Sequence, residues 1–334
     1  MPEIRKDPIF ERWVIVAPER SKRPQDYVVA KDEKKERECP FCEGNEGLTP
    51  PEIMAFRVEG SVKNSPGWWV RVVPNKYPAL SAKEDVTEKN EGLYTFMGGA
   101  GTHEVIIESR FHRVGLDSLD RCQIGEVFRS WRERLLELRK DDRLKYIQIF
   151  KNVGAAAGAS LEHTHSQIIG LPLVPPTVSV EIEAIKKYYS VHGKCILCEM
   201  VSQEIKIRKR VILRGKHFLC FSPFAARFPF EMWVVPVEHG DDFALIDREQ
   251  IDDLSAVMGT VLKKLSKLIE NIPYNVVLHT CPVNVSREGV LFHWYIEILP
   301  RITVIAGFEL GTGWFINPTP PELAAAALRD VPLD

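Results

Sequence analysis

The amino-acid sequence contains the same pattern twice, and an internal repeat constrains the fold of a chain more than its composition does. Cys39–Glu43 recurs as Cys195–Glu199, with both cysteines and the glutamate at the same places. Asp120–Ile124 recurs as Asp247–Ile251, with four of the five positions identical. A chain built in this way is expected to fold as two similar halves.

Each copy predicts the same order of elements, namely a strand, an amphipathic helix and two further strands. The helical apolar positions are Ile124, Val127, Phe128, Trp131, Leu135 and Leu138 in the first copy, and Ile251, Leu254, Met258, Val261, Leu265 and Leu268 in the second. The expected strands are 103–108, 146–150 and 163–169, then 230–235, 274–278 and 293–299. We expect an α+β fold of two halves, residues 1–175 and 190–334, each with an antiparallel sheet and one long helix. The proline-rich stretch 171–176 is expected to connect them.

Each half also has two cysteines and two histidines at equivalent places. The two sets are Cys39, Cys42, His112 and His163, and Cys195, Cys198, His239 and His293. Two thiolates and two imidazoles are the tetrahedral ligand set that zinc favours, and a site with four protein ligands is structural rather than catalytic. The sequence therefore predicts two structural zinc sites, with iron as the alternative metal. We expect the other cysteines, Cys122, Cys220 and Cys281, to be small buried apolar side chains.

Charge and hydropathy exclude some classes of partner. The formal net charge is -2, without the strongly basic balance that is typical of nucleic-acid-binding proteins. The first residues lack the apolar core of a secretory signal, and no run approaches the 18 apolar residues of a membrane span. We expect a cytoplasmic protein without a nucleic-acid or membrane partner.

The segment 152–167 indicates phosphate chemistry. Its first part is rich in glycine and alanine, so its backbone N–H groups can approach a phosphate closely. On a strand, alternate side chains share one face, which would place His163, His165 and Gln167 together. A neutral imidazole can attack phosphorus and leave again readily. The Gln167 amide can donate to the phosphate oxygens in the transition state, and Ser160 can bond the leaving phosphate.

The run from His163 to Gln167 resembles the active-site motif of the galactose-1-phosphate uridylyltransferase branch of the histidine-triad superfamily, which has His-Pro-His, a small residue and Gln. Stretches 20–24, 70–78 and 306–309 extend the resemblance over nearly the whole chain. It implies two histidine-triad-like halves and a ping-pong nucleotidyltransferase that forms a homodimer. By this resemblance, His165 attacks the α-phosphorus of UDP-glucose and releases glucose 1-phosphate. Galactose 1-phosphate then takes the uridylyl group.

The resemblance also implies individual roles. His163 matches a metal ligand, and His165 matches the nucleophile. Residues that match nucleoside or phosphate contacts are Asn75, Asn152, Gly158, Ser160 and Gln167, and those near the sugar phosphate, some from the other subunit, are Arg20, Arg23 and Glu309. The second half has Tyr295 and Glu297 at the places of the nucleophile and the glutamine, which predicts one active site per chain.

The identity of the substrates stays open. Thr303 and Phe315 stand where uridylyltransferases have a lysine and a glutamine that hold the hexose phosphate, and 307–313 resembles a sister branch that includes ADP-glucose:phosphate adenylyltransferase. The first hypothesis is a UDP-glucose:hexose-1-phosphate uridylyltransferase of galactose metabolism. The second is a phosphorylase that transfers AMP from ADP-glucose to phosphate. A non-catalytic zinc-stapled nucleotide-binding module is a third. A hydrolase is disfavoured, because Gln167 replaces the third histidine that hydrolases of this superfamily usually have.

Overall fold

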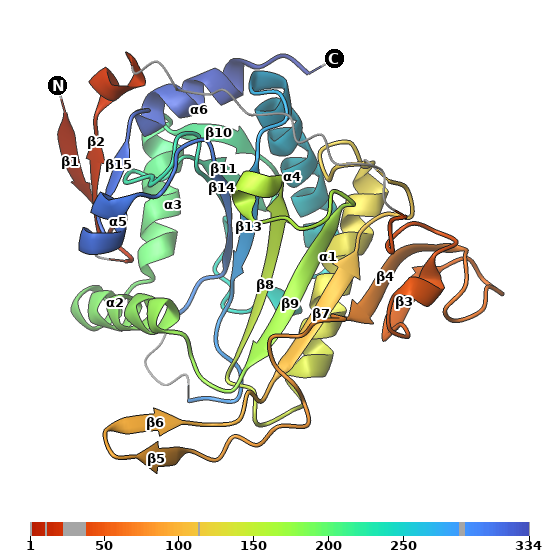
Figure 1. Ribbon diagram of the computed structural model, residues 1–334. Helices are drawn as coiled ribbons and strands as arrows, with labels where there is room; N and C mark the ends of the chain where they lie inside the picture. Colours follow the sequence, from red (N-terminus) through yellow and green to blue (C-terminus); the bar gives the residue numbers. More distant parts are fainter. Residues whose placement is uncertain (1, 11, 23–37, 113, 287–290, 334) are drawn as a thin grey trace.

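The computed structural model describes residues 2–10, 12–22, 38–112, 114–286 and 291–333, and its main feature is a ten-stranded sheet that runs through both halves (Figure 1). The strand order is β10-β11-β12-β14-β13-β8-β9-β7-β4-β3, and every neighbouring pair is antiparallel. The strands of the first half are β3 (Met54–Arg57), β4 (Trp68–Pro74), β7 (Thr102–Ile107), β8 (Tyr146–Val153) and β9 (His165–Leu171). Those of the second are β10 (Val211–Arg214), β11 (Phe218–Phe221), β12 (Met232–Pro236), β13 (Tyr274–His279) and β14 (Tyr295–Pro300).

The expected antiparallel α+β fold is confirmed, and the structure adds how the halves join. Strand β8 of the first half pairs with β13 of the second, with Asn152 opposite Asn275 and Phe150 opposite Val277. The two halves therefore share one sheet rather than forming two separate ones, and the central strands of each half lie next to each other.

The two long helices begin directly after the aspartate of the repeated Asp-Arg pattern. Helix α1 (Arg121–Leu138) begins after Asp120 and helix α4 (Arg248–Leu268) after Asp247; each aspartate accepts a hydrogen bond from the backbone N–H three residues later. Such side-chain caps satisfy N–H groups that have no partner within the helix. The predicted apolar positions of both helices are buried, except Leu268, which is partly buried. The helices contact each other behind the sheet (Figure 1).

The halves differ in what covers the other face of the sheet. In the second half, Cys220 and Val234 pack with the core under α1 and α4, while their neighbours Leu219 and Trp233 pack with Leu197 of helix α3 on the opposite face. Both faces there are covered by helices. In the first half, the described residues form a small apolar cluster on the opposite face, made of Trp68, Val73, Val105 and Ile107. Figure 1 shows helix α1 behind β7, β8 and β9.

The remaining elements surround the sheet. They are helices α2 (Pro176–His192), α3 (Ile196–Ile207), α5 (Gly307–Thr312) and α6 (Pro321–Asp330), short helices η1 (Pro18–Lys22), η2 (Glu46–Leu48), η3 (Ala155–Ala157) and η4 (Phe243–Leu245), a small sheet of β1 (Glu3–Lys6), β2 (Trp13–Val16) and β15 (Phe315–Asn317), and hairpin β5–β6 (Lys89–Glu91, Tyr94–Phe96). The proline-rich connector leads into α2, with Pro175 as its N-cap. In the described residues, no helix is both long and apolar enough to span a bilayer.

The three other cysteines follow the prediction in two cases. Cys220 and Cys281 are buried, but Cys122 is exposed, so its prediction was wrong. Cys122 lies on α1 two residues from the buried Ile124. Two residues correspond to about 200° around a helix, so the side chain points away from the buried stripe.

Candidate active site and metal centres

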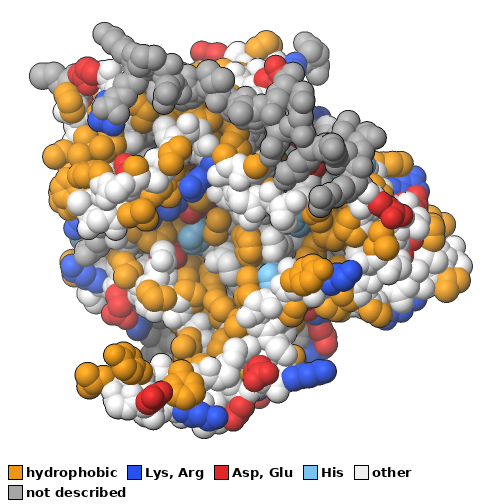
Figure 2. Space-filling view, viewed as in Figure 1, with side chains coloured by type: hydrophobic (Ala, Val, Ile, Leu, Met, Phe, Trp, Pro, Cys, Tyr) orange, Lys and Arg blue, Asp and Glu red, His pale blue; other side chains and the backbone are white. Residues whose placement is uncertain are grey.

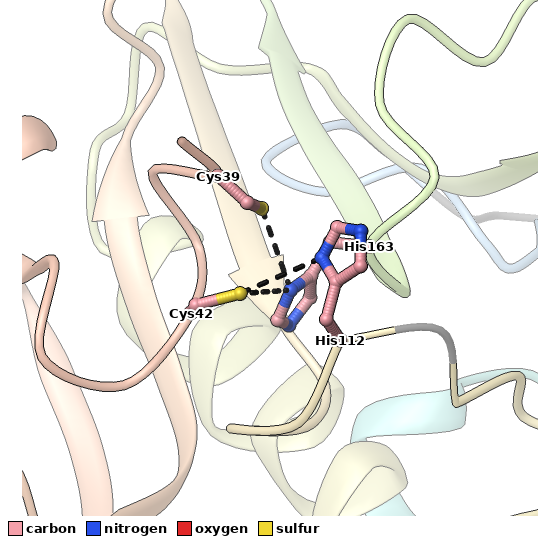
Figure 3. Close-up of side chains that lie close together, drawn as sticks. All are labelled: Cys39, Cys42, His112 and His163. Carbon is pink, nitrogen blue, oxygen red and sulfur yellow. Dashed lines mark hydrogen bonds between the residues drawn. The ribbon is translucent and has the colours of Figure 1, made fainter. Parts of the chain in front are cut away.

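The four predicted ligands of the first half come together in one cluster (Figure 3). The loop that contains Cys39 and Cys42 faces His112, which follows β7, and His163, which precedes β9. The Sγ of Cys42 lies 3.5 Å from Nδ1 of His112 and 3.6 Å from Nδ1 of His163, and the Sγ of Cys39 lies 3.6 Å from the latter atom. The cluster therefore ties a loop to the ends of two neighbouring strands.

The second half forms the equivalent cluster. The Sγ of Cys198 lies 3.5 Å from Nδ1 of His239 and 3.4 Å from Nδ1 of His293, and the Sγ of Cys195 lies 3.7 Å from the latter atom. Cys195 is the N-cap of α3, so this cluster ties α3 to the sheet.

Both clusters have the dimensions of a tetrahedral metal site. Ligands at 2.3 Å for sulfur and 2.0–2.1 Å for nitrogen, at tetrahedral angles, place the two atoms about 3.6 Å apart. In each cluster the buried histidine also donates its Nε2 hydrogen to a backbone carbonyl, from His163 to Ser109 at 2.7 Å and from His293 to Pro236 at 3.1 Å. Such bonds direct the other nitrogen, Nδ1, toward the metal position. The two groups can each hold a metal ion.

His165 is the first residue of β9 and is buried. Its Nδ1 lies 2.8 Å from the carbonyl oxygen of His163. A carbonyl can only accept, so Nδ1 is the protonated nitrogen of the neutral ring and Nε2 has the free lone pair. Burial lowers the pKa of His165, and the bond to the carbonyl opposes this shift only in part, which keeps the ring neutral near pH 7.

The alternation of side chains along β9 places His165 and Gln167 on the face of the sheet that points away from α1, the open face. Ser166, between them, accepts a hydrogen bond from Nε1 of Trp131 on α1, so it points to the helix-covered face. His163 lies just before the strand, in a bend, rather than within it as expected. Figure 2 shows histidine side chains at the base of a hollow on this face of the molecule.

The Gly/Ala-rich loop between β8 and β9 is held against the second half. Gly154 and Gly158 have φ values of 78° and 85°, which glycine adopts without a steric cost. Asn275 on β13 donates to the Oδ1 of Asn152 and to the carbonyl oxygen of Ala157, each at 2.8 Å. Because its oxygen is used in this way, the Asn152 amide presents its N–H group near Gly158. Ser160, which follows the loop, is exposed.

Gln167 is oriented by His103, a residue that the sequence did not mark. Nδ1 of His103 accepts from the backbone N–H of Ala79, so Nε2 is the protonated nitrogen, and it lies 2.8 Å from the Oε1 of Gln167. This bond turns the amide N–H of Gln167 away from His103. Nδ2 of Asn75 also lies 3.1 Å from Nε2 of His103, but both are donors, so this contact leaves the Asn75 amide hydrogens for another acceptor.

Two further side chains contact the nucleophile segment. The ring of Phe41, from the loop between the two cysteines, lies edge-on to His165, with centroids 5.3 Å apart. Lys151 on β8 is buried and donates to the carbonyl oxygen of His165 at 3.1 Å. The sequence alone does not reveal these two contacts, because each depends on how the strands and loops pack against one another.

Two of the three predicted sugar-phosphate residues, Arg20 and Glu309, are described, and neither is bonded to this group within one chain. Arg20 lies in η1, and Glu309 lies in α5, where its carboxylate accepts from the backbone N–H of Ala306 at the start of the same helix. Within the described ranges, no hydrogen bond or ion pair links either residue to His165. Arg23 lies outside the described residues.

The equivalent place in the second half is filled by ion pairs. Glu297 on β14 accepts from Arg227 at 2.7 Å, and its other oxygen lies 3.0 Å from Nε2 of His279. The ring of Tyr295 stacks on His279, with centroids 4.3 Å apart. Tyr295 and Glu297 are buried, and neither provides an imidazole at the place that corresponds to His165.

Comparison with known proteins agrees with this architecture. The family model described as galactose-1-phosphate uridyl transferase, N-terminal domain, matches residues 1–175, and that of the C-terminal domain matches residues 181–332. ADP-glucose phosphorylase of Arabidopsis thaliana is 40% identical over 99% of this chain and 93% of its own length. Galactose-1-phosphate uridylyltransferase of Thermotoga maritima is 32% identical over all of both chains. The crystal structure of an Arabidopsis thaliana ADP-glucose phosphorylase with bound ADP-glucose has a TM-score of 0.86 and 39% identity, with both chains fully covered.

The fold and these relatives together define the chain as a nucleotidyltransferase. It belongs to the galactose-1-phosphate uridyl transferase family, whose two domain models together match most of its length.

Proposed function

We propose that this enzyme transfers a nucleotidyl group in two steps through a covalent intermediate on Nε2 of His165. The contact between Nδ1 of His165 and the carbonyl oxygen of His163 is the main support, because it leaves Nε2 unprotonated on the open face of the sheet. A binding module without turnover has no need of a buried imidazole held in this tautomer.

In the first step, Nε2 attacks the α-phosphorus of a nucleotide sugar. The bond between that phosphorus and the bridging oxygen breaks, and the sugar 1-phosphate leaves. In the second step, an oxygen of the acceptor phosphate attacks the same phosphorus and the imidazole leaves. The N–H groups of Gln167, of Asn152 and of the loop around Gly158 stabilise the charge on the non-bridging oxygens in both steps. Ser160 bonds the leaving phosphate.

For the substrates, we propose ADP-glucose as donor and inorganic phosphate as acceptor, which yields glucose 1-phosphate and ADP. This reaction is the second of the three hypotheses that the sequence offers, and we place it first. The 40% identity to an ADP-glucose phosphorylase over nearly the whole chain supports it. So does Phe315, whose ring packs on Phe228 with centroids 5.7 Å apart, where uridylyltransferases have a glutamine for the hexose phosphate. A phenyl ring cannot replace an amide that bonds a phosphate.

The other candidate is the UDP-glucose:galactose-1-phosphate reaction of galactose metabolism. The family description and the Thermotoga maritima relative favour it. Both candidates use the same nucleophile and differ only in the base of the donor and in the acceptor.

We also propose that each Cys2His2 cluster holds zinc. Two thiolates and two imidazoles suit zinc better than iron, and four protein ligands leave no position for water, which makes both sites structural. The residues that would hold the ions are Cys39, Cys42, His112 and His163, and Cys195, Cys198, His239 and His293. In each site the metal stabilises the fold, and it takes no part in the transfer.

A homodimer is proposed for a related reason. Within one chain, Arg20 and Glu309 have no bond to the His165 group in the described ranges, although both match positions that surround the sugar phosphate. A second subunit would supply them to the site in trans, as the resemblance to the family implies. Arg23 has the same proposed role.

A four-way assay tests the substrates. The purified enzyme is incubated with ADP-glucose or UDP-glucose, each with phosphate or galactose 1-phosphate, and glucose 1-phosphate release is measured. The proposal predicts the highest kcat/KM for ADP-glucose with phosphate. A higher value for UDP-glucose with galactose 1-phosphate would establish the other candidate instead.

A further inference from the structure

A buried ion pair between Lys151 on β8 and Glu108, which follows β7, lies beside the segment that contains the nucleophile. Nζ of Lys151 donates to the Oε2 of Glu108 at 2.6 Å, and the two side chains are 1% and 0% exposed. Removing two charges from water is costly, so a pair of this kind persists only when its geometry and hydrogen bonds compensate. Neither side chain reaches the open face of the sheet, so the pair cannot contact a substrate.

Thr164, which separates the two histidines, forms hydrogen bonds with both members of the ion pair. Its Oγ1 accepts from Lys151 at 2.7 Å and donates to the Oε2 of Glu108 at 2.6 Å. The third ammonium hydrogen of Lys151 goes to the carbonyl oxygen of His165 at 3.1 Å. All three donors of the lysine are therefore used, two of them on the segment that contains the nucleophile.

The same residues fix the backbone around His165. The carbonyl oxygen of Thr164 accepts from the backbone N–H of Glu108 at 3.2 Å, and that of His165 accepts from Lys151. The carbonyl oxygen of His163 is then left for Nδ1 of His165. Each of three consecutive carbonyls thus has one defined partner, and the direction of the imidazole depends on all three.

We propose that Lys151, Glu108 and Thr164 are positioning residues that form a polar clamp on the nucleophile segment; this inference rests on the proposed role of His165. Related enzymes often have proline between the histidines, and a proline ring limits the backbone through its fixed φ. Threonine gives no such restriction. The clamp supplies by hydrogen bonds the rigidity that proline would supply through its ring.

The sharpest test compares Thr164→Val with Thr164→Ser. Valine has the shape of threonine but lacks the hydroxyl, whereas serine keeps it. Adduct formation is followed in a single turnover with ADP-glucose alone, over a range of donor concentrations. We expect the valine variant to form the adduct roughly ten- to hundredfold more slowly with the donor Kd unchanged, because a small misplacement of a nucleophile has effects of that size. The serine variant should match the wild type.

The double variant Lys151→Met with Glu108→Gln removes both charges together and avoids an unpaired buried charge. It should show the same loss of rate with the donor Kd and the metal content of the wild type. Wild-type adduct rates in both Thr164→Val and the double variant would overturn the clamp. If the double variant does not fold, the valine variant decides alone. A wild-type enzyme that forms no adduct at His165 would instead overturn the proposed function.

Discussion

The Nδ1 atom of His165 lies 2.8 Å from the carbonyl oxygen of His163, and the ring of His163 belongs to the first Cys2His2 cluster. The backbone of a proposed metal ligand therefore sets the tautomer of the proposed nucleophile. Nε2 of His163 also bonds the carbonyl oxygen of Ser109, so the side chain of His163 is fixed as well as its backbone. The Cys2His2 cluster thus includes the residue whose backbone orients His165.

Metal analysis tests the clusters. The wild type should contain about two zinc ions per chain. Cys42→Ser and Cys198→Ser should each lower the content to about one and reduce the melting temperature, because the binding energy of a structural zinc contributes to folding. Cys122→Ser is the matched control, since Cys122 is exposed on α1 and belongs to neither set. A wild type without metal would contradict the assignment.

His103 offers a second test, through the orientation of Gln167. His103→Phe keeps the size of the ring but removes the bond to the Oε1 of Gln167, so the amide can rotate. We expect kcat to fall about tenfold, less than the loss on removing a transition-state donor outright. His103→Gln can still donate to Gln167 and should retain most of the activity. Equal activity in the two variants would show that the bond has no positioning role.

The buried His279 predicts a dependence of stability on pH. Burial alone would lower its pKa, but the carboxylates of Glu297 and Glu181 outweigh burial and raise the pKa to about 9. A raised pKa in the folded state gives stability that is complete below the unfolded pKa of about 6.5 and is lost as the pH rises to about 9. Urea unfolding should show a loss of about 3 kcal/mol across this window.

The variant His279→Gln isolates this contribution. It cannot titrate, so its stability should fall less steeply with pH than that of the wild type, whatever its absolute stability. Parallel pH profiles for the two proteins would show that His279 is not protonated at neutral pH in the folded state.

Mixed dimers test whether Glu309 acts in trans. His165→Ala and Glu309→Ala should each be inactive or nearly so alone. If each site combines His165 of one subunit with Glu309 of the other, a mixed dimer regains one complete site. Co-expression in equal amounts should then restore about a quarter of wild-type activity, given random pairing in a twofold dimer. No recovery, in mixtures shown to contain mixed dimers, would place Glu309 in cis.

Much of the fold follows from local sequence patterns. Helices α1 and α4 are predictable because an aspartate cap precedes a regular apolar stripe in each. Cys122 also could have been placed correctly, since its position on the first of these helices is off the stripe. Helix α2 was hidden by its prolines, which suggested a connector although proline is also common at the first turn of a helix.

The site is predictable only in part. The metal ligands and the alternation of His165 with Gln167 are visible because unusual residue types recur at regular spacing. His103, Glu108 and Lys151 are not, because their roles depend on which strands are neighbours and in which register. Thr102–Ile107 reads as an ordinary strand, and only its pairing with β9 brings His103 to Gln167. Contacts between distant segments of this kind arise from tertiary packing.

The covalent intermediate is the most direct test of the account. The enzyme is incubated with labelled ADP-glucose without acceptor, digested under conditions that preserve phosphoramidates, and the modified peptide is mapped by mass spectrometry. The account predicts an adenylyl group on His165, its removal by phosphate with formation of ADP, and no label on His165→Ala. An active wild type without a nucleotide on His165, or a His165→Ala variant with full activity, would contradict it.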